Sequence, residues 1–320
     1  MSKHKVLIWS LVFLVILCSS CFGQTIIRVS TGGNDSSDGS SWTLAKKTIQ
    51  AGINAASPNG GGEIWVAAGT YSEHITLKAN CYLYGGFAGT ESQRTERDFS
   101  VNKSIIDGTQ NGNVVSASGL SAIACVDGFT IRNSGSSYYG IYCYSSSPTI
   151  TNNTINGNGG GICCYVSKPT ISNNTICGNG SGIGCIAPTN PTITNNTISG
   201  NSCGIFCTES SPKISNNTIS GNGFGVHCGA SSRPIITNNT ISENDDGVFC
   251  DGSSSPTIAS NMISKNDFGI HCYYASSPVI INNTINGNSY GVDCVSSSPT
   301  ITNNTINGNR GLYFVKRTPS

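Results

Sequence analysis

The chain has 320 residues, of which only 10% are charged, and its formal net charge is +1. This composition provides no basic surface for nucleic acid and no acidic tail, so we expect no nucleic-acid partner. Solubility therefore depends on the many Ser, Thr, Asn and Gly residues, while Ile and Val recurring at fixed places argue against disorder.

Residues 1–23 have the pattern of a secretory signal peptide. Lys3 and Lys5 precede an apolar run over residues 6–17, and small residues lead to Gly23, the expected last residue before cleavage. The run is too short to span a bilayer comfortably. Cys21 leaves a lipoprotein open as an alternative. We expect the mature chain to be secreted, periplasmic or at the cell surface, with no membrane contact beyond the signal peptide.

Residues 24–135 are interpreted as an N-terminal capping segment followed by irregular coils. A helix is predicted over residues 42–56 because Trp42, Ala45, Ile49 and Ile53 fall on one face, with Ser41 as its cap. Such a helix would cover the otherwise open end of a strand stack. Short strand-like runs such as EIWVAAGTY and VDGFTIRN follow it.

Residues 136–311 contain an internal repeat, the strongest signal in the sequence. The first unit reads GIYCYSSSPTITNNTINGNGG and the last reads GVDCVSSSPTITNNTINGNR. Eight units of 21 or 22 residues begin at Gly140, Gly161, Gly182, Gly204, Gly225, Gly247, Gly269 and Gly291. Residues 312–320 form a C-terminal tail, in which LYFVKR is a candidate last strand without an evident cap.

Each unit has too few apolar residues to form a core alone, so the units must stack. The Ile columns that begin at Ile141, Ile150 and Ile155 would then lie one above another at the strand spacing of about 4.8 Å. Because Ile150 and Ile155 are five residues apart, a corner must separate them. Asn153 suits the left-handed backbone of such a corner and can form an amide ladder along the stack. All length variation falls in the Ser-rich turn after the Cys strand, which in solenoids often borders the binding side.

The eight-residue Cys column that begins at Cys143 is predicted to be a reduced, buried stack. Neighbouring Cβ atoms at the strand spacing of about 4.8 Å lie farther apart than a disulfide prefers. The thiols then act as small apolar side chains. By register, Cys163, Cys177 and Cys203 point outward and are better candidates for reactivity or pairing.

Outward positions on the Cys strand are unusually aromatic, whereas the other two strands present mainly Thr, Ser and Asn. Exposed aromatic surface of this extent usually marks a binding site, and flat rings stack on sugar faces. An ordinary β surface or a face covered by a partner remains the alternative. The candidate ligand-binding residues are Tyr139, Tyr142, Tyr144, Tyr165, Phe206, Phe224, His227, Asp246, Phe249, Asp251, Phe268, His271, Tyr273, Tyr290 and Asp293.

Catalytic chemistry has weaker support on this face. The acids are scattered over three coils and no Lys or Arg accompanies them, so the catalytic residues stay undetermined, with His227, Asp251, His271 and Tyr273 as candidates. No metal site and no cofactor are predicted. If a cation binds, Asp245 with Asp246 and Asp251 is the place to look for calcium.

Two segments resemble a known family. IIRVSTGGNDSSDGSSWTLAKKTIQAGINAA followed by EIWVAAGTYSEHITL is similar to the start of many secreted β-helix proteins, including polysaccharide lyases. The units SPTITNNTISGN resemble the right-handed parallel β-helix repeat of the pectate-lyase-like superfamily and of periplasmic NosD proteins. The resemblance implies an all-β, right-handed parallel β-helix over roughly residues 26–310, and leaves activity open because fold does not fix function. Copper handling of the NosD kind is disfavoured by the few, scattered His and Met residues.

Two functions follow as hypotheses. The first is an exported β-helix that binds polysaccharide on the aromatic flank, with cleavage left open; if it is an enzyme, it is a polysaccharide lyase or glycoside hydrolase-like. The alternative is a non-catalytic structural or adhesive surface protein. The aromatic flank favours the first, and the uniform repeats and sparse charges favour the second. The oligomeric state is left open.

Overall fold

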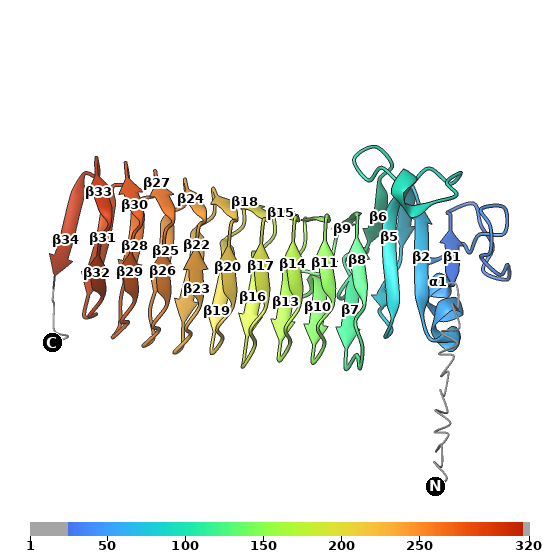
Figure 1. Ribbon diagram of the computed structural model, residues 1–320, viewed down its shortest axis with the longest axis horizontal. Helices are drawn as coiled ribbons and strands as arrows, with labels where there is room; N and C mark the ends of the chain where they lie inside the picture. The colour runs from blue at the N-terminus through green and yellow to red at the C-terminus, as the bar shows by residue number, and fades with distance from the viewer. Residues whose placement is uncertain (1–24, 316–320) are drawn as a thin grey trace, which may run out of the picture.

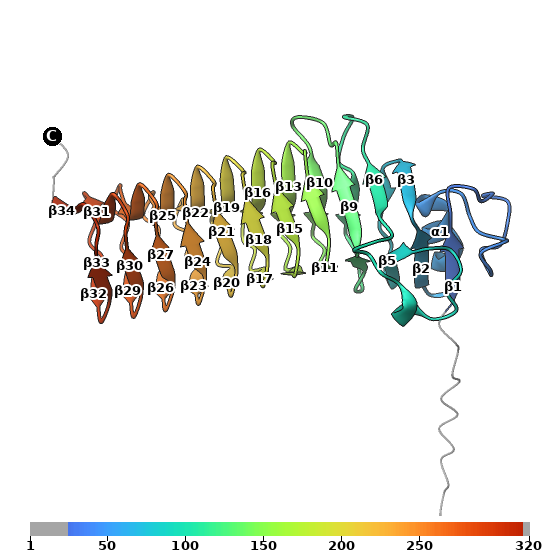
Figure 2. The ribbon, with the colours of Figure 1, turned by 90° about the horizontal axis from the view of Figure 1, so that it is seen from above.

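The structure, a computed structural model, describes residues 25–315, and the predicted signal peptide lies outside them. Over this range the chain winds into an elongated right-handed parallel β-helix, so the predicted all-β solenoid is confirmed (Figure 1). Each regular coil contributes one strand to each of three parallel sheets, which we call sheets A, B and C. The view from above shows the strands following one another in register along the axis (Figure 2).

The sheets take their strands from successive coils. Sheet A contains, in order, β1 (Ile26–Val29), β2 (Gly62–Ala67), β5 (Cys81–Phe87), β8 (Cys125–Asp127), β11 (Thr149–Thr151), β14 (Thr170–Ser172), β17 (Thr192–Thr194), β20 (Lys213–Ser215), β23 (Ile235–Thr237), β26 (Thr257–Ala259), β29 (Val279–Ile281) and β32 (Thr300–Thr302). Sheet B contains β3 (Gly69–Ser72), β6 (Ser104–Asp107), β9 (Phe129–Arg132), β12 (Thr154–Asn156), β15 (Thr175–Cys177), β18 (Thr197–Ser199), β21 (Thr218–Ser220), β24 (Thr240–Ser242), β27 (Met262–Ser264), β30 (Thr284–Asn286) and β33 (Thr305–Asn307). Sheet C contains β4 (Ile75–Thr76), β7 (Val115–Ser118), β10 (Tyr139–Tyr144), β13 (Gly160–Tyr165), β16 (Ser181–Ile186), β19 (Cys203–Thr208), β22 (Phe224–Gly229), β25 (Asp246–Cys250), β28 (Phe268–Cys272), β31 (Tyr290–Val295) and β34 (Gly311–Val315).

The α-helix lies at the β1 end of the stack, as expected for a cap, but it is shorter than predicted (Figure 1). Helix α1 covers Ile49–Ala56, and the hydroxyl of Thr48, not Ser41, accepts the capping hydrogen bond from the Ala51 N–H. The predicted first turns are not helical because Lys46 exchanges backbone hydrogen bonds with β1. Two 3₁₀ turns, η1 (Ser57–Asn59) and η2 (Arg94–Glu96), complete the helical elements among the described residues.

The interior of the regular coils consists of the predicted columns. Ile150 pairs with Ile171, Ile155 with Ile176, and the same register continues along sheets A and B. The Cys column that begins at Cys143 runs down the inside of sheet C, and its members are free thiols, as predicted. The other cysteines of the described range are free thiols as well. Burial raises the pKa of the Cys143 thiol, so this side chain is neutral and acts as small apolar filling.

At the corner between sheets A and B, two neighbouring residues share the roles predicted for Asn153 alone, which are the left-handed backbone and the amide ladder. Asn152 adopts the left-handed backbone (φ 56°), so assigning that conformation to Asn153 was wrong. Asn153 is buried and forms the predicted ladder, its amide donating to the Asn174 side-chain oxygen at 3.1 Å. A second buried ladder, which the sequence reading missed, runs along the corner between sheets B and C through Asn158, Asn179, Asn201, Asn222, Asn244, Asn266, Asn288 and Asn309.

The turn after sheet C absorbs the insertions, as the register indicated. In the shorter turns a single residue such as Ser145 adopts positive φ, whereas Ala230 and Ser231 both do so in a longer turn. The last described strand, β34, continues sheet C beyond the final repeat, in agreement with the candidate strand at LYFVKR.

Candidate functional site

The outer side of sheet C carries two columns of large side chains, which are separated on each strand by two consecutive buried positions, a glycine and an Ile or Val. In β22, Phe224 precedes Gly225 and His227 follows two residues later, and both side chains are partly exposed. A Cβ at Gly225 would lie 2.5 Å from the Gly247 carbonyl oxygen and 3.1 Å from the Asn244 amide nitrogen, so only glycine fits. The predicted binding residues of this face are all partly exposed or exposed, as expected for outward positions.

The aromatic residues form two groups and not one continuous flank. The tyrosine cluster, on β10 and β13, pairs Tyr139 with Tyr142 and Tyr144 with Tyr165, with ring centroids 5.9 and 5.7 Å apart. Strand β16 then interrupts the rings, since Gly184 occupies the outward position. The second group begins on β19.

This second group, which we call the phenylalanine–histidine file, comprises Phe206, Phe224, His227, Phe249, Phe268, His271 and Tyr290. Along its central column, the ring centroid of Phe249 lies 5.0 Å from those of both His227 and His271. The side column continues it, because Phe268 stacks on Tyr290 at 4.9 Å and on His271 at 4.6 Å. Tyr273 extends the file at its edge, 6.1 Å from His271. Rings therefore touch one another continuously from β19 to β31.

Carboxylates that looked scattered in the sequence each meet a histidine of the file. A side-chain oxygen of Asp251 lies 3.2 Å from His227 Nε2. His271 is held from both sides, with Asp246 3.0 Å from Nδ1 and Asp293 3.6 Å from Nε2. These pairs join positions 22 to 25 residues apart on adjacent coils, so only the stacking register brings them together. The contacts fix the orientation of both imidazoles.

Of the three cysteines predicted to point outward, Cys177 and Cys203 are partly exposed and Cys163 is buried. Cys163 does point to the outer side of sheet C, but only 2% of its surface is exposed. It interacts with the neighbouring Tyr139, and burial raises its pKa to about 12. Burial likewise raises the pKa of Cys203 to about 12. These raised pKa values disfavour the thiolate at Cys163 and Cys203 at neutral pH. Reactivity at the three outward cysteines stays a prediction.

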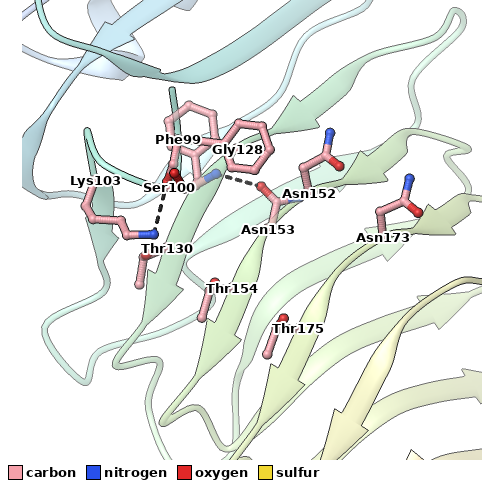
Figure 3. Close-up of a pocket in the computed structure, with 11 residues that line it drawn as sticks. Phe99, Ser100, Lys103, Gly128, Thr130, Asn152, Asn153, Thr154, Asn173 and Thr175 are labelled. Atoms are coloured by element: carbon pink, nitrogen blue, oxygen red, sulfur yellow. Dashed lines mark hydrogen bonds between the residues drawn. The ribbon is translucent and has the colours of Figure 1, made fainter. Parts of the chain in front are cut away.

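A separate pocket of about 170 Å³ lies on sheet B (Figure 3). It is next to the loop of residues 88–103, which projects from the stack (Figure 1). Phe99, Ser100 and Lys103 form its loop side, and the Thr130, Thr154 and Thr175 side chains stand in a row along its floor. Lys103 Nζ donates to the Phe99 carbonyl at 3.0 Å. The amide of Asn153 belongs to the ladder, so part of this pocket serves the fold.

The described residues do not fit a copper site. His227 and His271 lie on either side of the Phe249 ring, and no group of three or more His, Cys, Asp or Glu side chains within residues 25–315 is arranged to hold a metal ion. The Cys143 and Cys228 thiols of the Cys column are buried with raised pKa values, so they are not thiolates. Asp246 and Asp251 face different histidines, and calcium near them stays a prediction.

Sequence comparison identifies the family. The model of the family described as "Periplasmic copper-binding protein (NosD)" matches residues 70–245, and that described as "Right handed beta helix region" matches residues 213–319. The chain belongs to the NosD family. No curated protein matches its sequence. None of the helices within residues 25–315 is long and apolar enough to cross a membrane.

Solved structures with the same fold include enzymes named for polysaccharides. The A-module of mannuronan C-5 epimerase AlgE4 from Azotobacter vinelandii superposes with a TM-score of 0.56 at 19% identity, covering 84% of this chain and 92% of the module. The enzymatically active domain of bacteriophage CBA120 tailspike protein 2 gives 0.61 at 13% identity, covering 84% and 47%. An exopolygalacturonase from Thermotoga maritima gives 0.54 at 12%, covering 81% and 82%. At these identities the likeness establishes the shared fold.

Proposed function

We propose that this NosD family member is exported and binds a polysaccharide along the phenylalanine–histidine file of sheet C. The observation that carries the proposal is the uninterrupted contact of partly exposed rings from Phe206 to Tyr290, since exposed aromatic surface of this extent marks interaction sites. Two of the structural neighbours are named for a polysaccharide that they act on, which supports the same ligand class.

The file has the chemistry that sugar recognition requires. The flat faces of Phe249 and Phe268 offer apolar area for the C–H faces of pyranose rings, at a cost of little side-chain entropy. The Asp251 and Asp246 carboxylates beside them accept hydrogen bonds from sugar hydroxyls. Because successive strands repeat these groups at about 4.8 Å, a polymer lying along the axis meets several of them at once.

Binding of purified protein to an array of neutral and acidic polysaccharides tests the proposal. Phe249→Ala with Phe268→Ala should weaken binding by about tenfold or more, a loss of about 1.4 kcal/mol. The matched control is Thr197→Ala with Thr218→Ala, which removes outward side chains of sheet B. Equal loss in both variants, or no binding by the parent protein, would contradict the proposal.

Cleavage is a finer question on the same face. The His271–Asp246 pair has the geometry of an oriented imidazole, the arrangement used by general bases. Product formation that is lost in His271→Gln or His227→Gln, with binding retained, would identify an enzyme. Retained binding without any product would identify a lectin-like protein.

A rigid, non-catalytic rod is the second candidate, and the two Asn ladders favour it. They join each regular coil to the next through buried amides, which stiffens a long stack. Absence of polysaccharide binding, together with adhesion of the protein to cells or to itself, would support this role. Export is tested separately by fractionating the source cells and sequencing the mature N-terminus, which we expect near residue 24.

A further inference from the structure

The fixed charges on the phenylalanine–histidine file are all negative. Three carboxylates point outward here: Asp246 on β25, Asp251 directly after β25, and Asp293 on β31. Strands β10 to β31 of sheet C contain no Lys or Arg. The whole chain has 17 Lys and Arg residues and 16 Asp and Glu residues, so an average patch of its surface would carry charges of both signs.

The basic residues of the regular coils lie elsewhere. Lys213 is on β20 of sheet A, and Arg233 follows β22 in the turn toward sheet A. Lys265 lies at the corner between sheets B and C and pairs with Glu243 at 3.6 Å. Lys168 follows β13 in the turn toward sheet A, and Arg310 directly precedes β34. None of these five basic residues lies on the strands of sheet C that carry the file.

The two histidines do not supply a cationic binding group either. Each imidazole is directed at carboxylates of the same face, at 3.2 Å from His227 to Asp251 and at 3.0 and 3.6 Å from His271 to Asp246 and Asp293. With both imidazoles neutral the face carries three negative charges. With both protonated it still carries one net negative charge, because two positive charges offset two of the three.

We infer that the file selects a polysaccharide without acidic groups, such as a neutral glucan, xylan or mannan. A polyuronate stacked on Phe249 would bring carboxylates within the Debye length of about 8 Å of like charges, with no Lys or Arg to pair with them. A neutral polymer meets no such repulsion, and its hydroxyls can donate to the same carboxylates. The inference rests on the proposed function, because it concerns the ligand of that face.

Affinity electrophoresis or calorimetry with two sets of probes tests it. The neutral set is laminarin, xyloglucan and galactomannan, and the acidic set is polymannuronate and polygalacturonate. At low ionic strength we expect the best neutral polymer to bind at least about tenfold more tightly than either polyuronate, which corresponds to about 1.4 kcal/mol. Binding of the neutral polymer should change little as salt rises, because screening acts only on charged groups.

Two variants that remove negative charge test whether the carboxylates of the file, and not the net charge of the protein, weaken polyuronate binding. The triple variant Asp246→Asn, Asp251→Asn and Asp293→Asn should bind polyuronate several-fold more tightly than the parent protein. The control variant Asp38→Asn, Asp98→Asn and Glu243→Gln removes the same formal charge away from the file and should leave polyuronate binding unchanged.

The outcomes distinguish this inference from the proposal beneath it. Polyuronate binding as tight as neutral binding, lost in Phe249→Ala, would overturn the charge selection and leave polysaccharide binding intact. Equal gains in the triple variant and its control would also overturn it. Failure of both polymer sets to bind would overturn the proposed function and the inference together.

Discussion

The irregular N-terminal coils and the regular stack solve the same folding problem in different ways. Before residue 136, large and varied side chains fill the interior and its surroundings, as where Trp65 stacks on Phe87 with centroids 4.8 Å apart. Ion pairs such as Arg97 with Asp127 at 2.7 Å hold the projecting loop. In the regular stack, identical Ile and Cys columns and two Asn ladders repeat in each coil. The repetition frees the outer face of sheet C to vary, and the aromatic residues are found there.

The largest effect is expected from breaking an Asn ladder in the middle of the regular stack. Asn217→Ala removes five hydrogen bonds, including two that Asn217 accepts from Asn196 and one that it donates to the Ile193 carbonyl at 3.0 Å. Because the partners stay buried, we expect a loss of about 3 kcal/mol in the free energy of unfolding, measured by urea denaturation. Its exposed neighbour provides the control, since Asn216→Gly keeps a left-handed corner and should change stability by less than about 0.5 kcal/mol.

A smaller loss is expected from overpacking the N-terminal cap. A Cβ at Gly52 would lie 2.8 Å from a Val29 methyl and 3.0 Å from an Ile64 methyl. Gly52→Leu should therefore cost about 2 kcal/mol despite the better helix propensity of Leu. Hydrogen exchange should locate the loosening at α1 and β1, with the regular stack unaffected. Asn54→Ala, on the exposed side of α1, is the control, and loosening spread evenly over all coils would contradict local capping.

These two sites also show what the sequence could predict. A repeat of 21 or 22 residues fixes the register, so the Ile and Cys columns and the outward residues of sheet C followed directly from it. The helix start did not, because the residues before Thr48 pair with β1, a partner distant in sequence. The His271–Asp246 contact crosses between columns of adjacent coils, which a column-by-column reading misses. The invariant Asn158 column was visible in the repeat, and it marked the second ladder.

Acid should act on the N-terminal coils before the regular stack. Partial burial by itself would raise the pKa of Asp107. Hydrogen bonds from the Thr109 N–H and from Arg132 and Asn133 outweigh it, so the pKa of Asp107 is lowered. Burial would also raise the pKa of Glu91, but hydrogen bonds from the backbone N–H groups of residues 88–90 outweigh it and lower that pKa. A lowered folded-state pKa stabilises the fold above the unfolded value, near pH 4, and that stability is lost as pH falls through the folded value.

Hydrogen exchange at pH 7 and pH 3, corrected for intrinsic rates, measures this effect. We expect protection around residues 85–110 to fall about fivefold more than protection in β14 to β27. Glu91→Gln should reduce the pH dependence near residue 90, because its side chain no longer changes charge. A uniform loss of protection along the whole solenoid would show that the carboxylates of the N-terminal coils do not govern the acid response.

The smallest expected effect concerns a corner where the regular stack departs from its own pattern. At the corner between sheets B and C, most coils have a glycine with φ near 62°, such as Gly221, whereas Lys265 adopts φ 57° in its coil. A left-handed conformation is costly for a residue with a Cβ, and the exposed Lys265–Glu243 pair contributes little in return. Lys265→Gly should therefore raise the free energy of unfolding by about 0.5 to 1 kcal/mol. Gly221→Lys is the matched reverse change, because a Cβ there meets no atom within 4 Å and only the backbone is strained. It should lower stability by a similar amount, and changes of the same sign in both variants would show that the side chains, and not the backbone conformation, control this corner.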